Sequence, residues 1–226
     1  MPFPMPHLYI AKNVLEKSFF PIHSRSQFYL GSLCPDAVQF SESYDKKKSH
    51  ICRSGAQWGF VTDNEQWLND VLDFFCKNVK NSDISFLLGY CIHILADINN
   101  NEKLWIPFRL QHENKSFEEL VKLSHGEQFA IDQELYQKCS FIEEIFEDLS
   151  KSECTDFMDL VSREEMEKIK NNILTIQYAN KPQANSKSNK LFLYGQILDF
   201  IGDSVEFIIR NMNTVSAGIS TNFLQG

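Results

Sequence analysis

A histidine and an aspartate stand four residues apart in "GYCIHILADI", residues 89–98, the segment that reads as the most buried of the chain. If this segment is helical, His93 and Asp97 project from one face, because residues i and i+4 lie one turn apart. A helix that is apolar in almost every other direction is buried. Burial of a carboxylate is costly unless the group is paired or binds a cation. The pair therefore predicts either a buried hydrogen bond between the two side chains or a metal site.

Three further side chains, all within the first 50 residues, are candidates for the same metal site. His7 stands at the start of the first predicted helix, Asp36 follows a proline, and His50 follows three lysines. Three imidazoles and two carboxylates suit zinc, and also manganese or iron, because both ligand types are of intermediate hardness. The spacing between these residues is long, so composition alone does not identify a site.

The elements that must position these residues read as helices nearly throughout. Pro6 suits the first turn of a helix over about 7–17, and a short helix over about 26–34 is predicted to stop before Pro35. Residues 37–60 show no sustained periodicity and are predicted to form a long loop. A loop of that length is often functional.

Capping signals predict the starts of the later helices. Three capping boxes, each a Ser or Thr followed three residues later by Glu, begin at Thr62, Ser116 and Ser162. Asp83 is predicted to cap the helix over about 84–98 that carries the His–Asp pair. The run of three asparagines that follows is predicted to end that helix.

Two longer helices complete the predicted fold. One spans about 126–149 and the other about 191–212, and the polar segment 180–190 before the last helix is predicted to be a flexible loop. The last helix is too apolar to stand alone, so residues 1–226 are predicted to form one domain. The predicted fold class is all-α, a single-domain irregular helical bundle.

Charge and composition limit the possible partners. The net charge is −8, which repels phosphate backbones and does not favour a nucleic-acid partner. The six cysteines form no CxxC pair, which excludes a zinc finger and is typical of buried thiols in a reducing compartment. Neither a signal-peptide pattern nor a membrane-spanning apolar stretch is found, so the predicted location is cytoplasmic. The oligomeric state is left open.

Four segments in order carry a resemblance to a known family: residues 1–11, "FYLGSLCPDAV" at 28–38, "KKKSHI" at 46–51 and "LGYCIHILAD" at 88–97. Together they make the sequence similar to the zinc-dependent phospholipase C family, and in particular to its intracellular bacterial branch. The resemblance covers roughly residues 1–140. It implies a helical bundle of the phospholipase C and P1 nuclease type, one to three zinc ions, and cleavage of phosphodiesters.

The same resemblance implies a role for each of the five residues. Asp36, His50, His93 and Asp97 are expected to be the ligands of one zinc. His7 is expected to bind a second zinc, to which Asp97 would be a bridge. A carboxylate matching Asp36 is also a proposed general base of the family, so Asp36 is the predicted catalytic residue.

The sequence departs from the family in two places. Secreted members use the amino group and carbonyl of a processed N-terminal tryptophan as ligands, whereas this chain begins Met-Pro. The remaining zinc of the family uses a later histidine and a His-x-x-x-Glu pair, which neither His112 nor His125 supplies. Glu127 and Asp132 are candidates to substitute for part of that site. Otherwise His125 and Glu127 are first-turn residues of a helix capped by Ser124.

The predicted function is metal-dependent, and most simply zinc-dependent, hydrolysis of a phosphoester. The protein would be a phospholipase C-like phosphodiesterase, and its substrate a small molecule or a lipid. A divalent metal offsets the negative charge of the phosphoester, and Asp36 or a metal hydroxide orients or activates water. Two alternatives stay open. A site closed by four protein ligands would be structural, which gives a metal-stabilised helical binding module without activity. A metal-free interaction protein would use the same side chains as a buried hydrogen-bond network.

Overall fold

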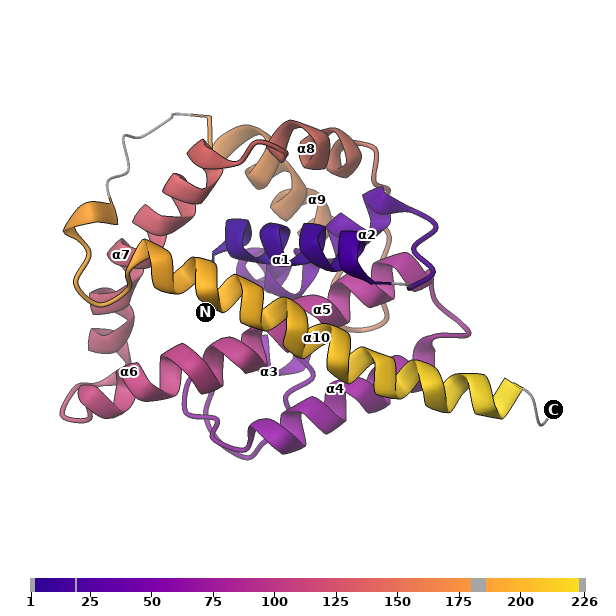
Figure 1. Ribbon diagram of the computed structural model, residues 1–226, viewed down its shortest axis with the longest axis horizontal. Helices are drawn as coiled ribbons and strands as arrows, with labels where there is room; N and C mark the ends of the chain where they lie inside the picture. The colour runs from indigo at the N-terminus through magenta and orange to yellow at the C-terminus, as the bar shows by residue number, and fades with distance from the viewer. Residues whose placement is uncertain (1–2, 19, 180–185, 224–226) are drawn as a thin grey trace.

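The computed structural model describes residues 3–18, 20–179 and 186–223, with the side chains of the last helix described as far as Val215. Over these residues the chain forms helices and no β-strand, which confirms the all-α prediction (Figure 1). The α-helices are α1 (Pro4–Lys17), α2 (Arg25–Gly31), α3 (Lys46–Ser49), α4 (Asn64–Asn78), α5 (Ile84–Asn100), α6 (Ile106–Gln111), α7 (Phe117–Lys138), α8 (Ile142–Ser150), α9 (Arg163–Asn171) and α10 (Tyr194–Phe223). The shorter 3₁₀ and π-helical segments are η1 (Cys34–Phe40), η2 (Asn101–Trp105), η3 (Asn172–Ile176) and η4 (Ser186–Ser188).

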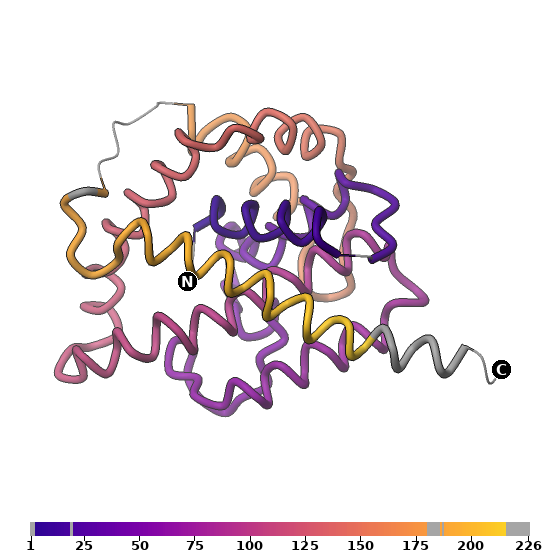
Figure 2. The backbone as a smooth tube through the Cα atoms, in the orientation of Figure 1, coloured from indigo at the N-terminus to yellow at the C-terminus, as the bar shows by residue number. Residues whose placement is uncertain are grey.

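Helix α5 lies at the centre of the fold. Every residue from Ser85 to Asn100 is buried, as expected of a helix that is apolar on all sides. Helices α1, α2, α4 and α10 pack against it, and α1 and α10 also pack against each other, running side by side in front of α5 (Figure 2). The predicted burial of the segment that carries the His–Asp pair is confirmed. None of the described helices combines the length and the hydropathy that crossing a membrane requires.

Helices α2 and α5 approach so closely that their contact has room only for glycine. A Cβ atom added to Gly31 would lie 2.2 Å from the carbonyl oxygen of Phe86. A Cβ atom added to Gly89 would lie 2.1 Å from the carbonyl oxygen of Phe28. Because both obstacles are backbone atoms, neither position accepts a side chain unless the helices separate. This glycine contact, the crossing of α2 and α5, places the end of α2 beside α5 one turn before His93.

Most of the predicted helix starts are confirmed. The Asp83 carboxylate accepts hydrogen bonds from the backbone N–H groups of Ser85 and Phe86. Ser116 and Ser162 form complete capping boxes at the starts of α7 and α9. The prediction at Thr62 is wrong by one residue. Asp63 caps α4 instead by accepting from the N–H of Gln66, and aspartate is the stronger capping residue.

Two predicted helices differ from the structure where tertiary contacts override local signals. Helix α5 does end within the asparagine run, at Asn100, but the chain stays helical through η2 into α6, and the Asn101 amide donates to Val61 O and Asn64 Oδ1. The predicted helix over 126–149 is two helices, α7 and α8, and the Phe141 ring between them packs on Tyr9 of α1.

Two other helices were predicted too short, and two loops were predicted too long. The first helix begins at Pro4 instead of His7, and α10 continues beyond 212. The loop predicted over 37–60 contains the end of η1 and the whole of α3. Of the predicted loop 180–190, residues 180–185 lie outside the described part, and the segment after them contains η4.

Gly89→Ala is expected to destabilise the fold, because its methyl group has no room against the backbone of α2. Overpacking of this kind lowers the free energy of unfolding by about 1–3 kcal/mol or more. Gly126→Ala in α7 is the control, since a Cβ there meets no atom within 4 Å. The free energy of unfolding of that variant is expected to rise by up to about 1 kcal/mol, because alanine has the higher helix propensity. Urea denaturation followed by circular dichroism measures both, and equal midpoints would contradict the close-contact argument.

Candidate metal centre

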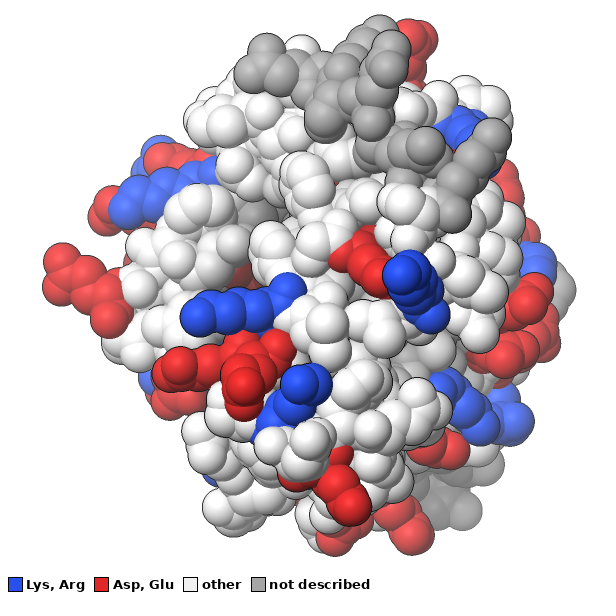
Figure 3. Space-filling view, turned by 90° about the vertical axis from the view of Figure 1, so that its left-hand side faces the viewer, with Lys and Arg blue, Asp and Glu red and all other residues white. Residues whose placement is uncertain are grey.

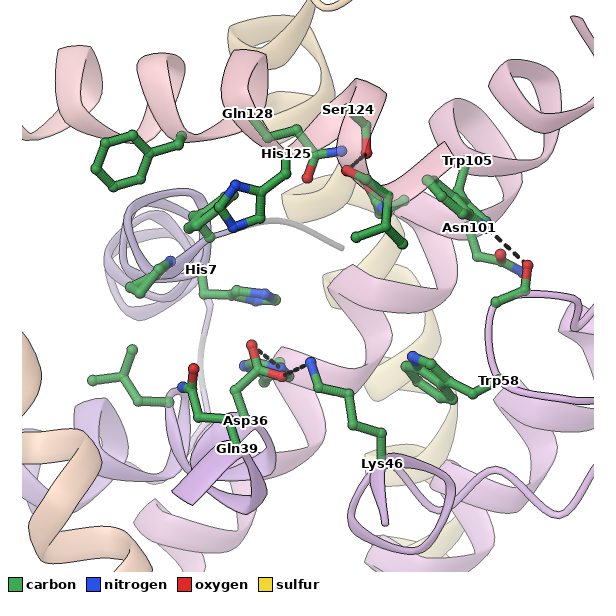
Figure 4. A pocket seen from close by; sticks show the side chains of 18 of the residues that line it. His7, Asp36, Gln39, Lys46, Trp58, Asn101, Trp105, Ser124, His125 and Gln128 are labelled. Atoms are coloured by element: carbon green, nitrogen blue, oxygen red, sulfur yellow. Dashed lines mark hydrogen bonds and ion pairs between the residues drawn. The ribbon is translucent and has the colours of Figure 1, made fainter. Parts of the chain in front are cut away.

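The five side chains predicted to bind metal lie together, and three of them, His7, Asp36 and His93, line one cavity. Figure 4 shows His7 and Asp36 at this cavity. His7 comes from α1, Asp36 from η1, and His50 from the C-terminal cap of α3, while His93 and Asp97 are one turn apart on α5. Four of them are at least 98% buried, and the side chain of Asp36 is 19% exposed to the cavity. Residues as far apart in the sequence as 7 and 97 thus meet in a single cluster.

Asp97 stands between the imidazoles. Its Oδ2 lies 3.2 Å from His50 Nε2 and 3.9 Å from His93 Nε2. Its Oδ1 lies 3.6 Å from His7 Nε2. The two oxygens of one carboxylate therefore face different sets of imidazoles, which is the arrangement that a bridging carboxylate requires.

Asp36 faces two of the same imidazoles. Its Oδ1 lies 3.5 Å from His50 Nε2, and its Oδ2 lies 4.0 Å from His93 Nε2. The same Oδ1 accepts a hydrogen bond of 2.6 Å from the ammonium group of Lys46. Asp36 is therefore shared between the imidazole cluster and a basic residue that the sequence interpretation did not assign to the site.

Contacts outside the cluster fix the orientation of two imidazoles. His93 Nδ1 lies 2.8 Å from the backbone carbonyl oxygen of Ser32. A carbonyl only accepts, so Nδ1 carries the proton and the lone pair of a neutral His93 is on Nε2, directed at the cluster. His50 Nδ1 is in turn 2.9 Å from the hydroxyl of Ser49. Hydrogen bonds to the second nitrogen are the usual means of orienting a metal-binding histidine.

The inward-facing atoms of the cluster are not satisfied by the protein. Within the described part of the chain, no hydrogen-bond partner is found for Nε2 of His7, His50 or His93, or for either oxygen of Asp97. Buried polar atoms without partners are rare and costly. Converging imidazole nitrogens and carboxylate oxygens are the donor set that zinc prefers. The residues present therefore fit a divalent cation.

Two overlapping groups have the spacing of metal ligands. One consists of His7, Asp36 and His93, the other of His50, His93 and Asp97, and the donor atoms in each lie within 4.8 Å of one another. His93 belongs to both, but its single free nitrogen binds only one ion. A second ion would therefore depend on His7 together with a carboxylate oxygen of Asp36 or the Oδ1 of Asp97.

The protonation states of the cluster follow from burial and from neighbouring charges. Burial and the adjacent His93 lower the pKa of His7 to about 3, and burial also lowers the pKa of His93. Both imidazoles are therefore neutral at pH 7, as metal binding requires. Burial opposes a charge on His50, but Asp36 and Asp97 raise its pKa above the ordinary value. Burial likewise opposes a charge on Asp36, yet Lys46 and the imidazoles hold the pKa of that carboxyl well below its usual range.

The cavity beside the cluster has a volume of about 690 Å³. His7, Asp36 and His93 line it on one side, and Lys46 lies next to Asp36. Aromatic and amide side chains form much of the remaining wall: Phe3, Trp58, Trp105, Phe117, Phe129, Asn101, Gln128 and Gln177. The sequence interpretation missed these wall residues, which carry no motif and come from distant segments.

The residues considered for the family's remaining zinc site do not join the cluster; they are His112, His125, Glu127 and Asp132. The carboxylate of Glu127 accepts from the backbone N–H groups of residues 190–192, and so holds the chain before α10. His112 Nδ1 contacts the carbonyl oxygen of Phe108 in its own helix. His125 lies at the cavity wall but, like Ser124, is inside α7, so the interpretation of Ser124 as a helix cap is wrong. The capping box at 116 starts this helix two turns earlier.

Asp132 has a positioning role at the start of α1. Its buried carboxylate accepts hydrogen bonds from the backbone N–H of Met5 at 2.8 Å and from the hydroxyl of Tyr178 at 2.9 Å. Gln177 donates a third, longer bond of 3.3 Å. Asp132 therefore ties the first turn of α1, two residues before His7, to α7 and to the segment after η3.

A family model described as zinc dependent phospholipase C matches residues 6–128, which is more than half of the chain. The matched segment contains all five residues of the cluster. Searches of curated proteins and of solved structures each gave no match.

Asp132→Asn is expected to flatten the dependence of stability on pH. Burial raises the pKa of Asp132 to about 7, so the protonated acid stabilises the folded state. That contribution is complete below the pKa of an unfolded aspartate, about 4, and is lost as the pH rises through about 7, by up to about 1.4 kcal/mol per pH unit. Asparagine remains uncharged and keeps an oxygen for the Met5 N–H.

Urea denaturation at several values between about pH 5 and pH 8, with a chelator present, measures this difference. Asp199→Asn, at an exposed position of α10, is the control and is expected to behave as the wild type. Identical pH profiles for Asp132→Asn and the wild type would show that Asp132 does not titrate in this range.

Proposed function

Because the chain belongs to the zinc-dependent phospholipase C family, we propose that it is a zinc-dependent hydrolase of a phosphoester. The observation that carries the proposal is the set of buried, unpartnered imidazole and carboxylate atoms directed at one point beside a large cavity. Such a site combines a place for a metal with access for a substrate.

The distances support a division of the ligands between two ions. Asp36, His50, His93 and Asp97 would hold the first zinc, with Oδ2 of Asp97 on the side of His50 and His93. His7 would hold a second, with Oδ1 of the same carboxylate. One or two zinc ions are proposed, and other divalent transition metals suit the same donors.

The metal and the surrounding residues would have separate roles in the reaction. Zinc, when bound, would offset the negative charge of the phosphoester and lower the pKa of a water molecule towards about 7. The Asp36 carboxylate faces the cavity and remains ionised beside Lys46, so it is proposed to accept a hydrogen bond from the attacking water and orient it. The aromatic wall would exclude other water and contact the organic part of the substrate.

The cavity favours an enzyme over the alternative of a metal-stabilised module without activity. His7, Asp36 and His93 reach the cavity surface, so a ligand in it would approach the metal directly. A small-molecule or lipid phosphoester fits its largely apolar walls. Figure 3, which shows the side of α6 and α7, has acidic and basic side chains interspersed over a larger uncharged surface. Together with the net charge of −8, this does not favour a nucleic-acid substrate.

His93→Ala is expected to lose zinc, because it removes the nitrogen common to both ligand groups. Zinc stabilises a protein that binds it only when folded, by about 4 kcal/mol at a concentration of 1,000 times Kd. Thermal unfolding with zinc and with chelator measures that gain, which is expected in the wild type and largely absent in His93→Ala. His23→Ala, at an exposed position outside the cluster, should keep it. Equal zinc stabilisation of both variants would contradict the assignment of His93.

The hydrolase proposal is tested with a chromogenic phosphodiester and with a phosphocholine ester. Hydrolysis is expected from the zinc-loaded protein, should stop when a chelator is added, and should return when zinc is restored. His23→Ala should be active and His93→Ala inactive. A wild-type protein that contains zinc but hydrolyses neither ester would support the non-catalytic module instead.

A further inference from the structure

Lys46 brings a fixed positive charge to the cavity beside the metal cluster. Its side chain is 13% exposed, and its Nζ lies 2.6 Å from Asp36 Oδ1 (Figure 4). Among the described residues that line the cavity, it is the one lysine or arginine, and Asp36 is the one carboxylate. An anionic group entering this cavity therefore meets a single permanent cation of the protein, next to the proposed metal ligands.

The position of Lys46 is set by the helix that also carries His50. The two residues begin and follow the four-residue α3, four positions apart. The Tyr90 hydroxyl of α5 donates to the carbonyl oxygen of Ser49, and the Trp67 indole N–H of α4 donates to that of His50. Because α3 is held from two neighbouring helices, Lys46 and His50 are both positioned at Oδ1 of Asp36.

The other two lysines of the run point elsewhere. Lys47 donates to the backbone carbonyl of Ser54, and Lys48 pairs with Asp159 at 3.1 Å on the surface. The basic run is therefore not a general surface patch, since only its first member faces the cavity. The spacing to His50 is the sequence signal that distinguishes Lys46 from its neighbours.

Lys46 has hydrogen-bonding capacity left for a ligand. An ammonium group donates three hydrogen bonds, and within the described part of the chain only Asp36 accepts one from Lys46. Charge balance points the same way. One divalent ion with the carboxylates of Asp36 and Asp97 is neutral overall, and Lys46 makes the site positive by one unit. A phosphodiester carries one negative charge.

We propose that Lys46 is a phosphate-binding residue that donates to a non-bridging phosphoryl oxygen of the substrate while it holds Asp36. The inference rests on the proposed function, since it takes the zinc-loaded cluster as the neighbour of Lys46. In this arrangement the ammonium supplies the charge that an additional metal ion would otherwise supply, in a chain whose Glu127 and Asp132 are engaged elsewhere. Fixed charges that meet developing negative charge are a large contribution to catalysis.

Binding of inorganic phosphate to the zinc-loaded protein, measured by titration calorimetry, tests this role without requiring turnover. Lys46→Met removes the charge at similar length, and Lys46→Gln removes the charge but keeps a donor for Asp36. Both are expected to bind phosphate about 10- to 100-fold more weakly, the usual loss for a hydrogen bond to a charged group. Lys48→Met, in the same helix, is the control and should bind as the wild type.

Zinc content, measured on each protein, separates the possible failures. Lys46 variants that keep their zinc and bind phosphate within about twofold of the wild type would overturn the proposal. Variants that lose zinc would also overturn it, because Lys46 would then act only by placing Asp36. A wild-type protein without zinc would contradict the metal centre itself, and the inference with it.

Hydrolysis supplies a second readout. Lys46→Gln is expected to lower kcat/KM for an anionic phosphodiester more than for an uncharged phosphotriester, because only the anion needs the ammonium. An equal loss for both esters would overturn the phosphate-binding role. A zinc-loaded wild type that binds phosphate through Lys46 but cleaves no ester would refute the hydrolase and leave the anion site supported.

Discussion

A carboxylate buried at the centre of a helical bundle requires positive charge around it, and this requirement organises the site around Asp97. The side chain is inaccessible to solvent, yet neither oxygen has a hydrogen-bond partner among the described residues. Imidazoles approach it from α1, α3 and α5 within 3.2–3.9 Å. A helical fold gains nothing from such an arrangement by itself. The proposed divalent ion would account for the burial, the orientation of the imidazoles and the missing partners together.

Each of the three histidines of the cluster is positioned by a contact outside it. His93 is oriented by a backbone carbonyl at the end of α2, which the glycine crossing brings against α5. His50 follows a short helix that α4 and α5 fix through an indole and a phenol. The first turn of α1, which leads to His7, is tied to α7 by Asp132. The geometry of the site thus depends on several independent helix contacts, as preorganised metal sites generally do.

The sequence predicted what is encoded locally. The His93–Asp97 spacing places both side chains on one helix face, and the capping residues at 83, 116 and 162 start their helices where expected. The assembly of His7, Asp36 and His50 with that pair came from family resemblance, because no periodicity connects such distant residues. Lys46 and the aromatic cavity wall were missed, since their role arises only when remote segments meet. The chain stays helical beyond the asparagines, through η2 into α6, for a similar reason: Asn101 is used in a contact with the segment before α4.

The orientation of His93 also has a consequence for how this site tolerates sequence change. The group that fixes the imidazole is a main-chain carbonyl, so its chemistry does not depend on which amino acid occupies position 32, provided that the residue is small enough for a fully enclosed site. The position of that carbonyl depends instead on Gly31 and Gly89, whose lack of a side chain allows α2 to approach α5. In divergent versions of this chain, a conserved pair of glycines would therefore be a better indicator of an intact centre than the identity of the residue that touches the histidine.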